Sequence, residues 1–242
     1  MKSEILSNRE LRIFKNQIDL PHIGIGGQEK LKKSRVLIVG AGGKGTFAMQ
    51  HLAAAGVGYI GICDNQVVEE TAIPRQTLYG SGDLGKQKAI IARQKLTENT
   101  PFSKIEIHNI CLSESNILSI ASAYDIIVDA TDTFASHQLI DQAALRIRTP
   151  VVFGALYQGF IMVSVFHFRD GHSLQQMFPS YPHNQGDTIL PAFLPGEVIL
   201  YSLAGNMLAN EVLKIMLDLP GILDGKVLKF DIAAYQSSVE TL

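Results

Sequence analysis

Short apolar runs recur along the chain and are separated by stretches with helical periodicity. The runs are continuous and rich in Val and Ile, a pattern typical of strands that are buried on both faces of a parallel sheet. We predict strands at residues 35–40, 59–64, 105–109, 124–131, 150–156, 159–168 and 225–234. We predict helices at residues 45–55, 86–97, 113–123, 136–148 and 197–217, with Ser113 as the N-cap of the third.

This alternation predicts a single α/β domain over residues 1–242. Its centre is expected to be a Rossmann-like, mostly parallel sheet flanked by helices. The runs at 150–156 and 159–168 are separated by only a short connection, which favours antiparallel pairing. The fold class is therefore α/β, with antiparallel strands added at one edge of the sheet.

Two segments depart from this rhythm. Residues 1–34 are predicted to form a helical arm that is interrupted by a turn at Gly24, Gly26 and Gly27. Residues 171–196 carry four prolines and no sustained period. A loop of that length inside a compact domain is usually a lid or a binding loop, so we predict a crossover or lid loop there.

Composition narrows the classes of function. The chain has 242 residues, of which 46% are hydrophobic and 18% charged, and its net charge is −2. Such a chain can bury one sizeable core, and its near-neutral charge argues against nucleic-acid binding. No apolar stretch approaches the roughly 18 residues of a membrane span, and the amino terminus lacks a signal-peptide pattern. We therefore expect no membrane partner. Cys63 and Cys111 form no Cys-x-x-Cys pair and are predicted to be small buried hydrophobes, which fits a cytoplasmic, reducing setting.

A glycine-rich fingerprint predicts a nucleotide site. Gly40-x-Gly42-x-x-Gly45 follows the first strand directly and opens a helix. In this context the backbone can approach a phosphate, whose charge then faces the amides at the start of the helix. Asp64 ends the second strand, where a carboxylate can accept the ribose hydroxyls. The fingerprint alone does not separate a nicotinamide dinucleotide from ATP.

The stretch RQTLYGSGDLGKQKA, at residues 75–89, favours ATP. An enzyme that breaks the bond between the α and β phosphates must stabilise charge on the departing pyrophosphate, and fixed cations do this well. Arg75 and Lys88 are placed to bracket such a group, whereas Lys86 is expected to be solvated. Asp132, in VDATD after the fourth strand, is a candidate ligand of Mg²⁺ on the same phosphates.

Five motifs carry a resemblance to a known family. In order they are GQEKLKKSRVLIVGAGGKG, AGVGYIGICD, RQTLY, GKQKA and DATD. Together they resemble the ThiF/MoeB/HesA adenylyltransferases, bacterial relatives of the ubiquitin-activating enzymes, from about residue 10 to 235. The resemblance implies ATP-dependent adenylation of the C-terminal glycine carboxylate of a small ubiquitin-like sulfur-carrier protein of the ThiS/MoaD kind, with release of pyrophosphate. It also implies a homodimer, and a place in thiamine or molybdopterin biosynthesis or in a related pathway.

The same resemblance implies roles for individual residues. The glycines Gly40, Gly42 and Gly43 line the nucleotide, Asp64 holds the ribose, Arg75 and Lys88 contact the phosphates, and Asp132 is the metal-linked catalytic acid. The lid loop at 171–196 would cover the adenylate and guide the incoming tail.

The chain also departs from the family pattern. The two Cys-x-x-Cys pairs of the family's zinc site are absent, so we expect no zinc, and Pro191 stands where many members carry a cysteine. The arm arginine that reaches the partner subunit's ATP is not found within residues 13–17, so it is supplied by Arg12, replaced by Lys15 or lost. Three further departures are Lys44 for a bulky apolar residue, Ala72 for an asparagine and Thr133 for another asparagine.

Several alternatives stay open at this point. Asp132 is either the catalytic acid or a helix cap, and Lys44 faces either a phosphate or solvent. The histidines form no metal-like cluster, and His183 in the lid loop is the one of interest. As a whole, the chain is an active adenylyltransferase, a catalytically weakened nucleotide-binding or dimerising relative, or a nicotinamide-dependent oxidoreductase.

Overall fold

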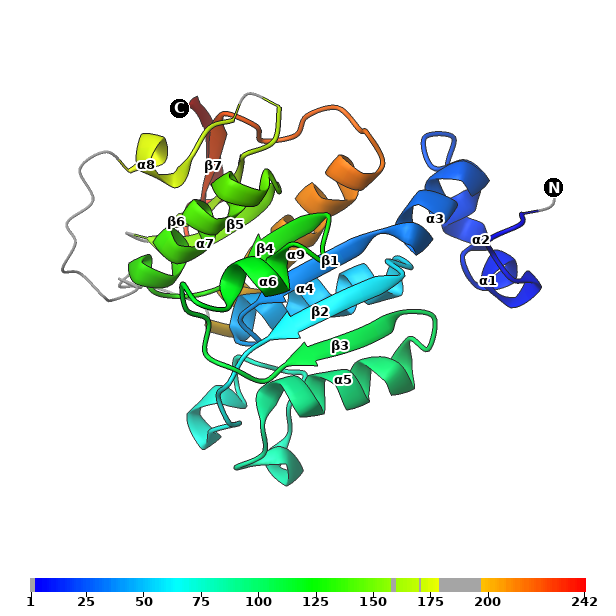
Figure 1. Ribbon diagram of the computed structural model, residues 1–242, viewed down its shortest axis with the longest axis horizontal. Helices are drawn as coiled ribbons and strands as arrows, with labels where there is room; N and C mark the ends of the chain where they lie inside the picture. The colour runs from blue at the N-terminus through cyan, green and yellow to red at the C-terminus, as the bar shows by residue number, and fades with distance from the viewer. Residues whose placement is uncertain (1–2, 158–159, 170, 179–196) are drawn as a thin grey trace.

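One twisted sheet forms the centre of the molecule (Figure 1). The computed structural model describes residues 3–157, 160–169, 171–178 and 197–242. Within them, eight strands lie in the order β3-β2-β1-β4-β5-β6-β7-β8. Their bounds are β1 Arg35–Val39, β2 Tyr59–Cys63, β3 Lys104–His108, β4 Ile126–Asp129, β5 Val151–Tyr157, β6 Phe160–Phe166, β7 Lys226–Asp231 and β8 Gln236–Thr241.

The strand directions confirm the predicted fold class. The pairs β3–β2, β2–β1, β1–β4 and β4–β5 are parallel, and the pairs β5–β6, β6–β7 and β7–β8 are antiparallel. In the parallel half, alternate residues of β1 enter two separate apolar clusters: Val36 and Ile38 on one face, Leu37 and Val39 on the other. Burial on both faces explains why these strands appear as continuous apolar runs in the sequence.

Helices cover both faces of the sheet. The helices α4 Gly43–Ala54, α5 Lys88–Asn99 and α9 Glu197–Met216 pack on one face, and α6 Ile117–Ala121 and α7 Phe134–Ile147 on the other. In Figure 1, α6 and α7 lie in front of the sheet and α4 and α9 behind it. Within the rear layer, α9 packs against both α4 and β5. This layering places the start of α4 and the start of α7 beside the carboxyl ends of the parallel strands.

The amino-terminal arm is helical, as predicted, but its glycines do not form a turn. It comprises α1 Asn8–Ile13, α2 Lys15–Ile18 and α3 Gly24–Lys33, so the predicted turn at Gly24, Gly26 and Gly27 is wrong. The helix persists because Gln28 and Leu31 are buried on its inner side. Glycine costs only about 1 kcal/mol per position in a helix, and tertiary packing outweighs that cost.

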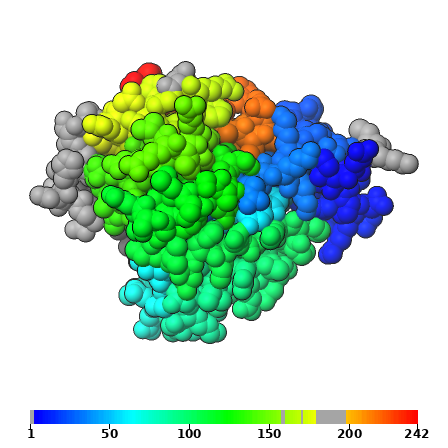
Figure 2. Space-filling view, in the orientation of Figure 1, coloured from blue at the N-terminus to red at the C-terminus, as the bar shows by residue number. Residues whose placement is uncertain are grey.

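The arm is anchored far from the carboxyl ends of the strands. Gln17 and Gln28 both donate to the carbonyl of Ala55, directly after the last residue of α4. Since α4 begins at the glycine turn, the arm lies about 18 Å away along that helix. Figure 2 shows the arm as a lobe at one side of the molecule.

Smaller differences from the prediction concern loops and the sheet edge. Strand β8 was not predicted, and the N-cap of α6 is Asn116 rather than Ser113. Short helices interrupt two loops: η1 Glu70–Ala72, η2 Ser81–Asp83 and α8 Leu174–Met177. Most of the predicted lid loop, with His183 and Pro191, lies outside the described residues. In the part of the chain that the structure describes, no helix has the length and apolarity needed to cross a bilayer.

Candidate active site

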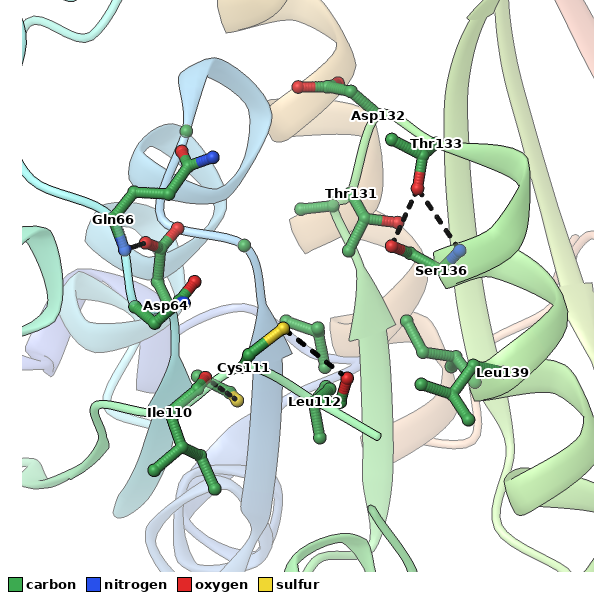
Figure 3. Close-up of a pocket in the computed structure, with 17 residues that line it drawn as sticks. Asp64, Gln66, Ile110, Cys111, Leu112, Thr131, Asp132, Thr133, Ser136 and Leu139 are labelled. Atoms are coloured by element: carbon green, nitrogen blue, oxygen red, sulfur yellow. Dashed lines mark hydrogen bonds between the residues drawn. The ribbon is translucent and has the colours of Figure 1, made fainter. Parts of the chain in front are cut away.

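A pocket opens at the carboxyl ends of β1, β2 and β4, where ligands bind in open α/β sheets (Figure 3). Asp64 and Gln66 stand on one side of it, and Asp132, Thr133 and Ser136 stand on the other. Between them lie three residues of the loop after β3, namely Ile110, Cys111 and Leu112. The pocket therefore combines an apolar wall with a carboxylate on each side.

The glycine turn forms the wall between the two carboxylates. Gly40 has a φ of +97°, which favours glycine, and a Cβ there would lie 2.8 Å from the carbonyl oxygen of Ala130. At Gly45, a Cβ would lie 1.8 Å from the carbonyl oxygen of Gly40. Gly42 lines the pocket, and a Cβ there would lie 3.8 Å from Nε2 of Gln76, an ordinary contact, whereas the Cβ side of Gly43 is filled by the ring of Tyr201. Gly40 and Gly45 thus serve the packing of the turn, and Gly42 faces the cavity.

Replacing Gly45 by alanine is expected to lower the free energy of unfolding by about 2 to 3 kcal/mol, because the new methyl group overlaps a backbone oxygen. Gly26→Ala is the matched control, since that helical glycine has nothing within 4 Å of its Cβ position. The control should be neutral or stabilising by up to about 1 kcal/mol. Urea unfolding followed by circular dichroism measures both, and equal stabilities would contradict the close packing of the turn.

Asp64 is fixed by the backbone before any ligand arrives. Its Oδ2 accepts from the backbone N–H of Ala41 at 2.7 Å, and its Oδ1 accepts from the backbone N–H of Gln66 at 2.7 Å. Each carboxylate oxygen can accept a second hydrogen bond. The side chain therefore ties the glycine turn to the end of β2 and still offers acceptors to the pocket.

Asp132 lies on the other side, at the end of β4, with 54% of its side chain exposed. Its Oδ1 lies 3.0 Å from the Nζ of Lys44, which is buried. Lys44 therefore does not face solvent, and it does not line the pocket either, so both alternatives for this side chain are wrong. The capping alternative for Asp132 fails as well, because the N-cap of α7 is Thr133, whose hydroxyl accepts from the backbone N–H of Ser136.

The two predicted phosphate cations sit next to the pocket and do not line it. Lys88 is buried in the first turn of α5, and its Nζ donates to the side-chain oxygen of Gln66 at 2.8 Å. Arg75 is half-buried, with its guanidinium carbon 5.8 Å from the ring centroid of Tyr201. Lys88 is one side chain away from the pocket, behind Gln66, whereas Arg75 lies over the ring of Tyr201, which packs on Gly43 and does not line the pocket.

Tyr79 connects the cation segment to the glycine turn, a role that was not predicted. Its hydroxyl donates to the carbonyl of Ala41 at 3.0 Å and lies 3.4 Å from the carbonyl of Lys88. Burial, reinforced by the charge of Asp64, raises the pKa of this phenol, so it stays a neutral donor. The motif RQTLY thus carries a structural residue beside its cation.

A buried acid–base pair supports the loop that bears Asp132. Asp129 accepts from Nδ1 of His137 at 2.7 Å and from the hydroxyl of Thr131 at 2.7 Å. Burial raises the pKa of the Asp129 carboxyl, but the His137 imidazole and the hydrogen bonds from His137 and Thr131 outweigh it and hold the pKa below its ordinary value. This pair was not predicted, because its members lie on different elements, β4 and α7.

Both cysteines lie in the pocket wall. Cys63 is buried as predicted, and burial raises the pKa of its thiol to about 12, so it is unreactive at neutral pH. The prediction that Cys111 is buried is wrong, because it lies on the exposed loop after β3. Among the described residues, no group of three or more His, Cys, Asp or Glu side chains is arranged to hold a metal ion.

The predicted site residues thus lie together around the start of α4, except for Arg12 and Lys15 of the amino-terminal arm. The residues that line the pocket are Gly40, Gly42, Asp64 and Asp132, and those adjacent to it are Gly43, Arg75 and Lys88. Arg12 and Lys15 lie on the arm at the far end of α4, where Lys15 pairs with Asp19. Lys86 is exposed, as expected.

Similarity to known proteins agrees with this geometry. A sulfur carrier protein adenylyltransferase of Thermus thermophilus is 36% identical over 231 residues, which cover 93% of this chain and 84% of that protein. A probable molybdopterin-synthase adenylyltransferase of Porphyra purpurea is 35% identical, and this chain spans only 60% of its length. The crystal structure of PaaA superposes with a TM-score of 0.80 at 22% identity, covering 100% of this chain and 76% of PaaA, which shows the shared fold. Residues 14–242 match the ThiF family, and the chain belongs to it.

Proposed function

We propose that this chain is an ATP-dependent adenylyltransferase that activates the C-terminal glycine carboxylate of a small ubiquitin-like sulfur-carrier protein. The observation that carries the proposal is the pocket itself, where Asp64 and Asp132 stand on opposite sides of a cavity that Gly40 and Gly42 also line. The similarity to the Thermus thermophilus sulfur carrier protein adenylyltransferase, which extends over most of both chains, supports the choice of substrate.

In this reaction Asp64 accepts the ribose hydroxyls, and the amides at the start of α4 face the phosphates beside Gly42. The carboxylate oxygen of the carrier attacks the α phosphorus of ATP. The bond from that phosphorus to the bridging oxygen breaks, and pyrophosphate leaves with the electron pair. The products are an acyl-adenylate and pyrophosphate, with no covalent enzyme intermediate.

The chain contributes position and charge. Negative charge grows on the departing pyrophosphate. Lys88 stands one side chain away from the cavity, behind Gln66, and Arg75 lies over the ring of Tyr201 beside the start of α4. Fixed cations at such a place stabilise the transition state without reorganisation.

Asp132 fits a magnesium ion that arrives with the nucleotide. Its carboxylate is a hard oxygen ligand, is half-exposed and lines the pocket. Mg²⁺ is commonly held by one or two carboxylates and the substrate phosphates, so a single acid suffices. When bound, the ion neutralises phosphate charge. The absence of zinc remains a prediction from the missing cysteine pairs.

We also propose a cytoplasmic homodimer in which the arm acts in trans. Arg12 and Lys15 lie about the length of α4 away from the pocket of their own chain. A second copy that presents its arm to this pocket would supply the cation that the family pattern expects there. The pathway served by the carrier is thiamine or molybdopterin biosynthesis or a related sulfur transfer, and the lid loop at 171–196 would cover the adenylate.

Isotope exchange tests the proposal directly. With ATP, Mg²⁺ and the cognate carrier protein, labelled pyrophosphate is expected to enter ATP, because adenylate formation is reversible. A carrier that lacks its terminal glycine is the control and should give background exchange. ATP binding without any exchange, with a carrier proven in its pathway, would instead favour the catalytically weakened relative.

A further inference from the structure

Lys44 occupies an unusual place for a cation. It lies in the first turn of α4, where the helix dipole disfavours positive charge, and only 2% of its surface is exposed. A buried ammonium is costly unless it is paired and hydrogen-bonded. Three groups fulfil that need here: the carbonyl of Thr131 at 2.6 Å, the carbonyl of Gly154 at 3.0 Å and the carboxylate of Asp132 at 3.0 Å.

The two members of the ion pair differ in their freedom. An ammonium has three donors, and all three of Lys44 are used inside the protein. Lys44 does not line the pocket, whereas Asp132 lines it and is 54% exposed. Lys44 is therefore anchored by the protein interior, and it in turn fixes the position of the Asp132 carboxylate at the edge of the pocket.

A cation bound to Asp132 would have to share that carboxylate with the ammonium. Two positive charges around one carboxylate repel each other, and the half-buried setting screens this repulsion less than bulk water does. The polyphosphate of a nucleotide adds negative charge at the start of α4 and relieves the repulsion. Metal and nucleotide should therefore favour each other's binding here.

We propose that Lys44 is a positioning residue that orients Asp132 and weakens its hold on a divalent cation, so that metal enters the site together with the nucleotide. The inference rests on the proposed function, since it takes ATP as the ligand and Asp132 as the acid facing the metal. Beyond that function, it assigns to Lys44 the role of setting the Mg²⁺ concentration that ATP binding requires.

Lys44→Gln is the test variant, because the amide retains donors for the two carbonyls and removes the charge. ATP is titrated into the protein by calorimetry over a series of Mg²⁺ concentrations, and the Mg²⁺ concentration that gives half of the maximal ATP affinity is recorded. We expect this midpoint to fall by roughly tenfold in Lys44→Gln, as for the loss of one charged interaction. Lys86→Gln, at an exposed lysine on the opening loop of α5, should leave it unchanged.

Controls separate this role from a purely structural one. Thermal unfolding establishes that Lys44→Gln is folded, and Lys44→Met replaces it if it is not. In an Asp132→Asn background, removing the lysine charge should no longer move the Mg²⁺ midpoint. An unchanged or raised midpoint in a folded Lys44 variant, with wild-type protein that binds ATP, overturns the inference and leaves the proposed function intact. Failure of the wild type to bind ATP at any Mg²⁺ concentration overturns the proposed function, and this inference with it.

Discussion

Asp132→Asn is expected to reduce pyrophosphate exchange by about a hundredfold to a thousandfold while ATP still binds. The substitution keeps the size of the side chain and removes the negative charge that we assign to the metal. Transition-state stabilisation of this electrostatic kind is worth about that much in other enzymes. ATP should still bind, without the contribution of metal at Asp132, because Asp64 and the glycine turn, which we propose contact the nucleotide, are bonded to each other and not to Asp132. Exchange is measured with saturating carrier protein, and ATP binding by calorimetry.

Asp218→Asn is the matched control. Asp218 is also an exposed aspartate with an ammonium partner, since its Oδ2 lies 2.7 Å from Nζ of Lys30, but it lies outside the pocket. Exchange in this variant should stay within about twofold of wild type, because exposed ion pairs contribute little. Normal exchange in folded Asp132→Asn protein would remove Asp132 from the mechanism.

His137→Ala is expected to lower the free energy of unfolding by about 3 to 5 kcal/mol. The substitution leaves the buried Asp129 carboxylate without its imidazole partner, and uncompensated buried charges cost about that much. It also removes the edge-to-face contact between the imidazole and Phe153, whose ring centroids lie 4.9 Å apart. Urea unfolding at pH 7 measures the change.

Two comparisons isolate the charge. His51→Ala removes an exposed histidine and should be nearly neutral, and adding Asp129→Asn to His137→Ala should recover part of the lost stability. If the double variant is no more stable than His137→Ala, packing rather than charge explains the loss.

The loss of stability in His137→Ala is expected to depend on pH. In the wild type the pKa of Asp129 is held below its ordinary value, so the stability from its pairing is present above about pH 4 and is lost as pH falls through the folded-state pKa. In His137→Ala the carboxyl loses the group that lowers its pKa, and burial then raises it. The gap between wild type and variant should therefore be widest near pH 7 and narrow toward about pH 4.

The sequence predicts the central fold well because the parallel strands are buried on both faces. Continuous apolar runs such as 35–40 have no other common explanation when helical segments separate them. Strand β8 was missed because all of its residues are exposed, so its sequence, QSSVET, carries no hydrophobic pattern. The first residues of α3 are predicted as a turn because their glycines argue against a helix locally, and the tertiary burial of Gln28 and Leu31 reverses that preference.

The candidate site was predictable where a motif fixes a backbone position. Gly42, Asp64 and Asp132 each follow a parallel strand, so topology brings them to one edge of the sheet. The direction of a long side chain is a different matter. Lys44 bonds to carbonyls 87 and 110 residues away in sequence, at Thr131 and Gly154, and no local pattern indicates such partners. The exposed position of Cys111 likewise follows from a loop path that composition does not specify.

The composition of β8 has a consequence for association between molecules. As the outermost strand of the order, it presents backbone groups along a border where a strand from a neighbouring molecule could add. Its side chains are mostly hydroxylic or charged, and Glu240 is held 2.6 Å from Nζ of Lys229 on β7. Adding a second strand beside β8 would cover few apolar groups. The polar sequence of β8 thus has two effects: it gives no hydrophobic pattern from which the strand could be predicted, and it disfavours aggregation through this edge of the sheet.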